Sequence, residues 1–308
     1  MITLEDKVNS MLVNDAELEK YFATRDNDEH IHIKKPSTYI DEVKKYFDGE
    51  IHAGASLGFD KLDDFFRIRE GETSIVAGYS GHGKSMFLSQ VILKMIKCGH
   101  KALVASFEMT PKAQLARWAR QGLGSDLPTD DFIESFIHGL DDRLYIYDQT
   151  GTVNPDRVMK VIYYSAEVLQ CDTIVIDSLM KCSVNEDDMN AQKNFIDRVC
   201  VAARDLGVHI FVVAHSRKGQ DETTEPPTKW SVMGSSNITN LADNVVTVYR
   251  NKKKEEQLAM PLTDSELEKV KSAPDAMFYV TKQRHGTGWE GKLSLYFDNK
   301  SLRYRDQR

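Results

Sequence analysis

Residues 78–85 read Gly-Tyr-Ser-Gly-His-Gly-Lys-Ser and combine three glycines with a lysine and a serine. The spacing matches G-x-x-x-x-G-K-[ST], a pattern in which backbone N–H groups at a helix N-terminus surround phosphate oxygens. Glycine permits this close approach because it carries no Cβ atom. The alternative is a glycine-rich turn without a ligand. The residues expected to hold a nucleotide and its Mg²⁺ are Gly78, Ser80, Gly81, Gly83, Lys84 (at the β- and γ-phosphates) and Ser85 (on the metal).

Two carboxylates follow apolar segments further along the chain. Asp177 follows Ile174-Val-Ile176, and Glu108 follows residues 102–107. A carboxylate at the end of a buried strand is the usual second group that orders Mg²⁺ beside such a loop, the Walker B position. Glu108 would point into the cleft at the carboxyl ends of the strands, where it could orient a water molecule for hydrolysis. The plainer alternatives are that Asp177 caps a turn and that Glu108 is a surface residue near a helix N-terminus.

His215 ends the apolar segment 210–214, so it is expected at the same edge of a parallel sheet. There it could contact the γ-phosphate and relay the state of the nucleotide to the loop that follows. The alternative is a histidine that forms only local hydrogen bonds.

The segment 217–232 is long and has no periodicity, which is typical of a functional loop. Its cations, Arg217, Lys218 and Lys229, could hold the phosphates of a nucleic acid. Three acidic residues in the same segment cancel that charge, so an ordinary solvated loop is the alternative.

Lys282 and Arg284 are separated by one residue, so an extended backbone would place both cations on one side. In a monomer they would form a plain charged edge. In a ring they could reach the γ-phosphate bound to a neighbouring subunit, as an arginine finger does.

The periodicity of apolar residues indicates the elements that would position these side chains. Apolar strands are expected at 74–77, 102–107, 144–147, 173–176 and 210–214, with helices between them. Strands that are apolar on both faces and alternate with helices indicate a parallel sheet covered on both sides. Further strands at 245–249, 277–281 and 293–297 follow one another, with a charged loop or short helix at 251–275. The expected fold class is α/β, a mostly parallel twisted sheet that ends in antiparallel strands, with helices on both faces.

Three parts of the chain differ in pattern. Residues 1–37 are charge-rich and indicate a small helical appendage or a tail. Residues 38–53 contain Tyr39, Ile40, Val43, Tyr46 and Phe47 at helical spacing, which predicts a linker helix with one apolar face. That helix could dock on its own domain or on a neighbouring subunit. Residues 54–308 are expected to form the nucleotide-binding domain.

Composition excludes several classes of protein. The net charge of −7 argues against a global basic surface for nucleic acid, although local basic loops remain possible. The four cysteines form no C-x-x-C pair, so a zinc site or a disulfide framework is not expected. No apolar run approaches the ~18 residues that span a bilayer, and the charged N-terminus does not resemble a signal peptide. We therefore expect a cytoplasmic protein without a membrane partner.

Taken together, the motifs resemble those of DnaB-like replicative helicases in the RecA-like ATPase superfamily, including the phage T7-type and Twinkle helicases. The resemblance extends over about residues 55–305. The segments that carry it are GFDKLDDFF, GYSGHGKS, ASFEM (followed by Gln114-Leu115 and Arg117), IVIDS, VVAHSRK, GSSNITNLADNVVTVYRN and TKQRHGTGWEGKLSLYFD. Seven motifs in the family's order make the resemblance specific.

The resemblance implies a RecA-like P-loop NTPase core that hydrolyses ATP with Mg²⁺ and assembles into a homo-hexamer or another ring around single-stranded DNA. It further implies translocation from 5′ to 3′ and unwinding of forked DNA. The roles it implies are catalysis by Glu108 and Lys84, phosphate sensing by His215, a finger formed by Lys282 and Arg284, and adenine contacts by Arg250 and by Tyr296 or Phe297.

Two departures from the family pattern bear on function. Asn240 stands where the family usually has Gln, and its shorter amide would weaken the coupling between phosphate and DNA. The 37 N-terminal residues are too few for the family's collar or primase domain. A separate primase or loader is therefore expected as a partner, and the compact chain looks phage-like, which would place it in a bacterial host's cytoplasm.

Two other functions share parts of this pattern. A RecA- or RadA-like recombinase has the same phosphate loop, Walker B strand and Glu, but it would pair DNA strands rather than separate them. An ATP-dependent helicase regulator or loader would do neither alone. Glu108 and Arg284 argue against a purely passive binder.

Overall fold

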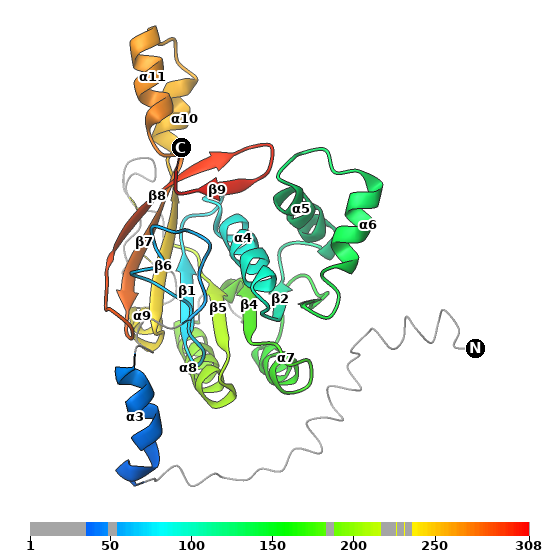
Figure 1. Cartoon of the computed structure of the whole chain (residues 1–308), viewed down its shortest axis with the longest axis vertical. Coiled ribbons are helices and arrows are strands. Elements are labelled where there is room, and N and C mark those ends of the chain that lie inside the picture. Colours follow the sequence, from blue (N-terminus) through cyan, green and yellow to red (C-terminus); the bar gives the residue numbers. More distant parts are fainter. Residues whose placement is uncertain are drawn as a thin grey trace, which may run out of the picture.

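The computed structural model describes residues 35–48, 54–182, 188–216, 226, 231 and 236–307 (Figure 1). Within these residues a nine-stranded sheet has the order β3-β2-β4-β5-β1-β6-β7-β8-β9. The strands are β1 (Thr73–Ala77), β2 (Ala102–Ser106), β3 (Leu144–Ile146), β4 (Thr173–Asp177), β5 (His209–Val213), β6 (Asn244–Arg250), β7 (Ala276–Gln283), β8 (Gly291–Asp298) and β9 (Arg303–Arg305). Strands β1 to β6 pair in parallel, and β7, β8 and β9 are antiparallel. The expected α/β fold with an antiparallel end is therefore confirmed.

The central strands read as continuous apolar runs because both of their faces are covered. Every residue of β1, β2, β4 and β5 is buried. In β7 the buried residues largely alternate with half-buried ones, since one face of the antiparallel end is less covered. β6 is still buried on both faces, so the sheet changes from two-sided to one-sided burial at β7 and β8.

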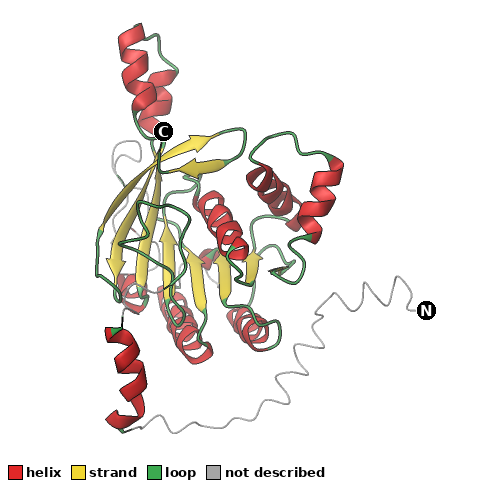
Figure 2. Cartoon of the chain, viewed as in Figure 1, coloured by secondary structure: helices red, strands yellow, loops and turns green. Residues whose placement is uncertain are grey.

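Helices cover the two faces of the sheet and create two cores (Figures 1 and 2). On one face lie α4 (Lys84–Lys97), α5 (Pro111–Leu123) and α6 (Asp130–His138); on the other lie α7 (Pro155–Glu167), α8 (Met189–Leu206) and α9 (Ser236–Leu241). Ile75 and Val76 are neighbours in β1, yet they pack into different cores because successive side chains point to opposite faces.

Residues 251–275, expected as a charged loop or short helix, form two helices. They are α10 (Lys252–Leu258) and α11 (Asp264–Ser272), which project from the sheet between β6 and β7 (Figure 1). A full capping box at Thr263 and Glu266 begins α11: the Glu266 carboxylate accepts from Thr263 N, and the Thr263 hydroxyl accepts from Glu266 N.

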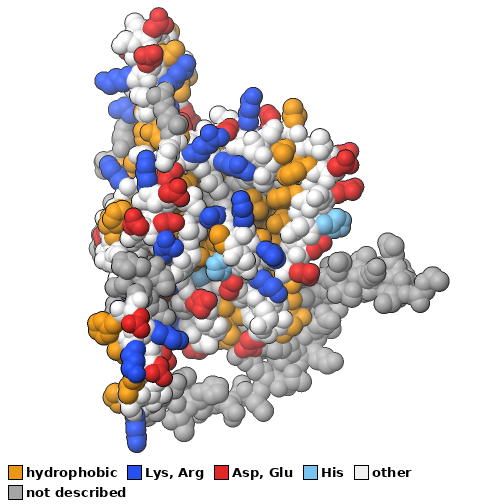
Figure 3. Space-filling model, in the orientation of Figure 1, with side chains coloured by type: hydrophobic (Ala, Val, Ile, Leu, Met, Phe, Trp, Pro, Cys, Tyr) orange, Lys and Arg blue, Asp and Glu red, His pale blue; other side chains and the backbone are white. Residues whose placement is uncertain are grey.

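Within the segment expected as a linker helix (38–53), a 3-10 turn (Pro36–Tyr39) is followed by α3 (Ile40–Phe47), and residues 49–53 lie outside the described residues. Tyr39, Ile40 and Val43 are 39%, 51% and 52% exposed, and Figure 3 shows apolar side chains at the surface of this helix. The described helices of the chain are all too short or too polar to cross a bilayer.

Candidate nucleotide site

The glycine-rich loop lies between β1 and α4, at the carboxyl edge of the parallel strands. Gly81 and Gly83 have φ angles of 75° and 88°, in the left-handed region that favours glycine. A Cβ atom on Gly83 would clash with the hydroxyl of Tyr304 from β9, so a larger residue there would require that side chain to move. Ser80 and Gly81 are exposed, which leaves the outer turn of the loop open to a ligand.

Lys84 is 5% exposed and folds back over the loop. Its Nζ donates to the carbonyl oxygens of Gly78 at 3.0 Å and Tyr79 at 2.9 Å. Burial lowers the pKa of Lys84 to about 8, although the Asp177 and Glu108 carboxylates act in the opposite direction. The ammonium group is therefore held among the loop's own backbone oxygens, in the place from which it can contact a phosphate.

Asp177 is the last residue of β4 and is 6% exposed. The Ser85 hydroxyl donates a hydrogen bond to its carboxylate. Burial raises the pKa of Asp177, whereas the bond from Ser85 lowers it. A hydroxyl and a carboxylate side by side at the N-terminus of α4 are the oxygen ligands that Mg²⁺ prefers, so these residues fit a nucleotide-bound magnesium ion.

Glu108 follows β2, the strand that pairs with β4. Its Oε1 accepts from the Ser178 Oγ at 2.8 Å and lies 3.5 Å from the His215 Nε2. The hydrogen bond from His215 lowers the pKa of Glu108 to about 2; burial opposes this, and the bond from Ser178 and the charge of Lys84 reinforce it. Glu108 is therefore ionised at neutral pH. Such a weak base is better suited to orient a water molecule than to remove its proton unaided.

His215 lies between the lysine and the glutamate. Its Nδ1 is 3.5 Å from the Lys84 Nζ, and its Nε2 is 3.5 Å from the Glu108 Oε1. An ammonium group can only donate, so Nδ1 accepts and Nε2 carries the proton that faces the carboxylate. This tautomer connects the phosphate-binding lysine to the candidate catalytic carboxylate.

Arg250 ends β6 on the other side of the loop, and its side chain is 49% exposed. Its backbone N–H donates to the Nδ1 of His82, a fully buried residue of the phosphate loop, at 3.1 Å. Burial, with the nearby charges of Lys252, Lys84 and Arg250, lowers the pKa of His82 to about 4. A neutral histidine therefore links the phosphate loop to the strand that carries Arg250.

Tyr304 of β9 is one of the aromatic residues beside the loop, and the sequence had not marked it. The adenine contacts implied for Tyr296 or Phe297 stay a prediction. The Tyr304 Oη approaches Gly83, and Phe297 packs behind it with ring centroids 4.9 Å apart. Burial raises the pKa of Tyr304 to about 12, so its hydroxyl stays neutral. The three-residue strand β9 was not predicted, and no local periodicity marks it.

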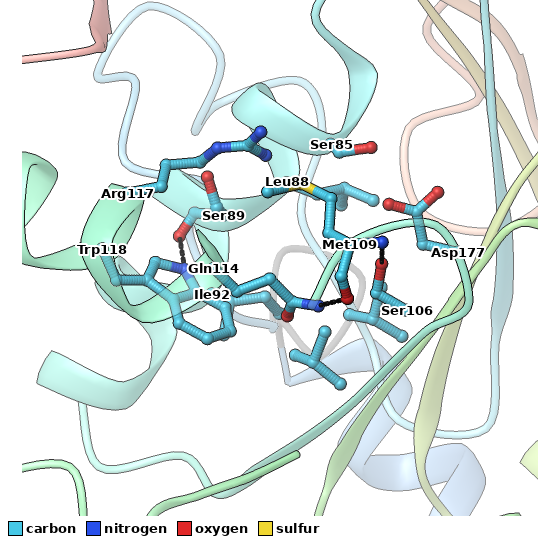
Figure 4. A pocket seen from close by; sticks show the side chains of 12 residues that line it. Ser85, Leu88, Ser89, Ile92, Ser106, Met109, Gln114, Arg117, Trp118 and Asp177 are labelled. Carbon is cyan, nitrogen blue, oxygen red and sulfur yellow. Dashed lines mark hydrogen bonds between the residues drawn. The ribbon is translucent and has the colours of Figure 1, made fainter. Parts of the chain in front are cut away.

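Arg117 of α5 also reaches this site, although in the sequence it stood out only as part of a motif. Its guanidinium acts electrostatically on Asp177 and Tyr304, and burial lowers its pKa. It lines a cavity of about 30 Å³ with Ser85, Gln114 and Trp118, and Figure 4 shows the polar ends of Arg117 and Ser85 at the same rim. That volume suits a water molecule or two rather than a ligand.

Lys282, Arg284 and Asn240 are not brought to this loop. In the register of β6 and β7, Gln283 pairs with Asn244, which pairs with Ser74 near the start of β1. These residues therefore lie at the amino edge of the sheet, ~16 Å along β1 from the phosphate loop. Asn240, expected to bind the nucleotide, therefore does not lie at its own subunit's phosphate loop, and neither do Lys282 and Arg284. Arg217, Lys218 and Lys229 lie outside the described residues.

The fold and the loop define a P-loop nucleotide-binding domain. A family model described as an AAA domain (AAA_25) matches residues 66–221, half of the chain, and the chain belongs to this family. The Twinkle homolog protein, chloroplastic/mitochondrial, of Arabidopsis thaliana is 20% identical over 235 residues. That match covers 70% of this chain and 33% of the relative, so the chain spans about a third of its curated relative's length.

Two solved structures share the fold. One is a structure of an ATPase domain, which superposes with a TM-score of 0.69 at 15% identity, covering 88% of this chain and 98% of that one. The other is a DnaB-like replicative helicase, solved in a study of its interactions with primase, which superposes with a TM-score of 0.68 at 17% identity, covering 98% and 71%. The RecA-like fold expected from the resemblance to DnaB-like helicases is thereby confirmed.

Proposed function

We propose that this chain is the motor of an ATP-driven DNA helicase that works as a ring, translocates from 5′ to 3′ on single-stranded DNA and unwinds forked duplexes. The observation that carries the proposal is the division of the catalytic groups between two edges of one sheet. Lys84, Asp177 and Glu108 lie at the carboxyl edge, whereas Lys282 and Arg284 lie at the amino edge. A site that needs both sets is completed only where two subunits meet.

In this proposal Lys84 and the N-terminus of α4 hold the phosphates of ATP. Ser85 and Asp177 hold Mg²⁺, which when bound neutralises charge on the phosphate oxygens. Glu108, ionised and fixed by Ser178, orients the attacking water, and His215 senses the phosphate through Lys84 and Glu108. Arg284 stabilises charge on the phosphoryl group bound to the neighbouring subunit, and Lys282, which donates to three carbonyl oxygens of its own subunit, lies beside it.

The DNA contacts are assigned to Arg217, Lys218 and Lys229, which follow His215 in the chain. We also assign α3 to the assembly. Its exposed residues Tyr39, Ile40 and Val43 suit an apolar contact with a neighbouring subunit better than a contact with water. A separate primase or loader would complete the replication machinery.

The test measures ATP turnover with and without single-stranded DNA, strand separation on a forked substrate, and particle mass with and without nucleotide. We expect DNA-stimulated turnover and unwinding by an assembly of several subunits. The Glu108→Gln variant should bind ATP with unchanged affinity and hydrolyse it at least ~100-fold more slowly. A monomer whose ATP turnover is unchanged by DNA would contradict the proposal. So would pairing of DNA strands without unwinding.

A further inference from the structure

Asp243 is a buried carboxylate at the amino edge of the sheet, outside the nucleotide site. Its side chain is 3% exposed and precedes β6. The two oxygens have different partners: Oδ2 accepts from the backbone N–H of Thr73 at 2.9 Å, and Oδ1 accepts from the Arg284 Nη1 at 2.9 Å. The Nε2 of His285 lies 3.8 Å from the same Oδ1. A buried carboxylate is costly unless such partners satisfy it, so this arrangement constrains both neighbours.

Thr73 is the first residue of β1, the strand that leads into the phosphate loop. Backbone hydrogen bonds join the same three segments: Asp243 N donates to Thr73 O at 3.0 Å, and Arg284 N donates to Asp243 O at 2.9 Å. The guanidinium of Arg284 is therefore attached, through one carboxylate, to the base of its own subunit's phosphate-binding strand.

The C-terminal end of α9 binds the side chains of both Lys282 and Arg284. The Arg284 Nη2 donates to Asn240 O at 2.7 Å. The Lys282 Nζ donates to the carbonyl oxygens of Thr239, Asn240 and Ala242 at 2.9, 2.9 and 2.6 Å. Carbonyls at a helix C-terminus lack helical partners, which makes them good acceptors for cations. The Arg284 side chain nevertheless remains 39% exposed, and its two bonds engage two of its five N–H donors.

We propose that Asp243 is the positioning residue of the arginine that acts across the subunit boundary. It holds the guanidinium in one orientation with donors still turned outward, and it ties that orientation to β1 of the same subunit. Asp243 touches no nucleotide; it acts through Arg284. This inference rests on the proposed function, because it requires that Arg284 serve the neighbouring subunit's ATP.

The first variant is Asp243→Asn. Its remaining amide oxygen can still accept from Thr73 N–H, whereas its NH₂ group faces the Arg284 donors and cannot accept from them. We expect kcat for ATP to fall ~10–100-fold, as it does when the partner that orients a functional group is lost, with KM within about twofold. In an Arg284→Ala background the same change should lower kcat no further, because Asp243 acts only through Arg284.

Mixed rings separate this role from an effect on the variant's own phosphate loop. Asp243→Asn subunits have an intact phosphate loop and a misaligned Arg284. Lys84→Ala subunits have a defective phosphate loop and a correctly held Arg284. Equal mixing should create working sites at about a quarter of the interfaces, so turnover should recover. If turnover recovers in the control mixture described below but not in this one, Asp243 acts on the phosphate loop of its own subunit through Thr73. That result would overturn the inference. Wild-type turnover by Asp243→Asn would overturn it as well.

The control pair is Arg284→Ala mixed with Lys84→Ala. If this pair does not recover, the assignment of Arg284 to the neighbour fails, and the inference about Asp243 fails with it. Should Asp243→Asn not assemble, Asp243→Glu keeps the charge but displaces the carboxylate by one methylene. The same cycle and the same mixtures are then measured with that variant.

Discussion

Glu108 is a side chain whose ionisation depends on its hydrogen-bonding neighbours. Two groups that favour the charged form, His215 and Ser178, contact the same oxygen. His215 in turn lies 3.5 Å from the Lys84 Nζ, so the three side chains form one connected group. The low pKa of Glu108, about 2, follows mainly from the hydrogen bond with His215.

The pH profile of turnover tests this arrangement. A lowered pKa means that Glu108 stays ionised until the pH falls far below 4.5, so wild-type kcat/KM should show no acid limb from this group above about pH 4. In His215→Ala the pKa of Glu108 rises toward its ordinary value of 4.5, so an acid limb should appear above about pH 4. Ser178→Ala should shift it less, because its bond is the smaller cause. An unmoved acid limb in His215→Ala would contradict the assignment.

At the scale of elements, the projecting pair α10 and α11 depends on one buried lysine. The Lys254 Nζ forms an ion pair with the Asp275 Oδ1 at 2.7 Å and donates to the carbonyl oxygens of Lys271 and Ala273. Asp275 also accepts from Phe297 N, so this cluster joins the helical pair to β7 and β8. Most of the other side chains of these two helices are exposed.

Replacing this lysine should loosen the pair without unfolding the domain. Asp275 is 34% exposed and can be hydrated when Lys254→Met removes its partner, so we expect a local loss of ~1–2 kcal/mol rather than the larger cost of a fully buried pair. Backbone amides of α10 and α11 should exchange with solvent about tenfold faster. Lys253→Met, an exposed neighbour, is the control. Equal exchange rates in the two variants would show that Lys254 does not hold the pair.

At the scale of the whole molecule, two features are consistent with contact to a neighbouring subunit. The candidate catalytic groups are divided between the two edges of the sheet, and α3 exposes an apolar face away from both cores. In the proposed ring, a neighbouring subunit completes the nucleotide site, and α3 is suited to contact that neighbour. Both features therefore support the same assembly.

Substitutions on α3 test this assembly. Ile40→Asp combined with Val43→Asp should reduce particle mass toward that of a single chain and abolish DNA-stimulated turnover, because charges would replace the apolar contact. The dissociated single chain should still bind ATP at its phosphate loop. Lys45→Ala, on an exposed polar position of the same helix, should leave the mass unchanged. Light scattering reports the mass, and assembly that survives the two aspartates would assign α3 another role.

Much of the fold could be predicted because its signals are local. Buried parallel strands read as apolar runs, and the carboxyl ends of such strands meet at one edge. Lys84, Glu108, Asp177 and His215 could therefore be expected together. The bounds of the helices between these strands were not predicted. Gly122 lies within α5, whereas Gly124 caps its C-terminus in the left-handed conformation, which cannot be read from the identity of a glycine.

By itself, the sequence determined which residues are candidates for the chemistry and in which order the strands and helices occur, since both depend on neighbours along the chain. Only the tertiary structure decided which distant segments meet. Tyr304 covers Gly83, Asp243 joins Thr73 to Arg284, and Arg284 lies at the edge opposite to its own phosphate loop. These contacts come from the register of the antiparallel strands and from packing between residues far apart in the chain, which leave no periodic signal in either partner.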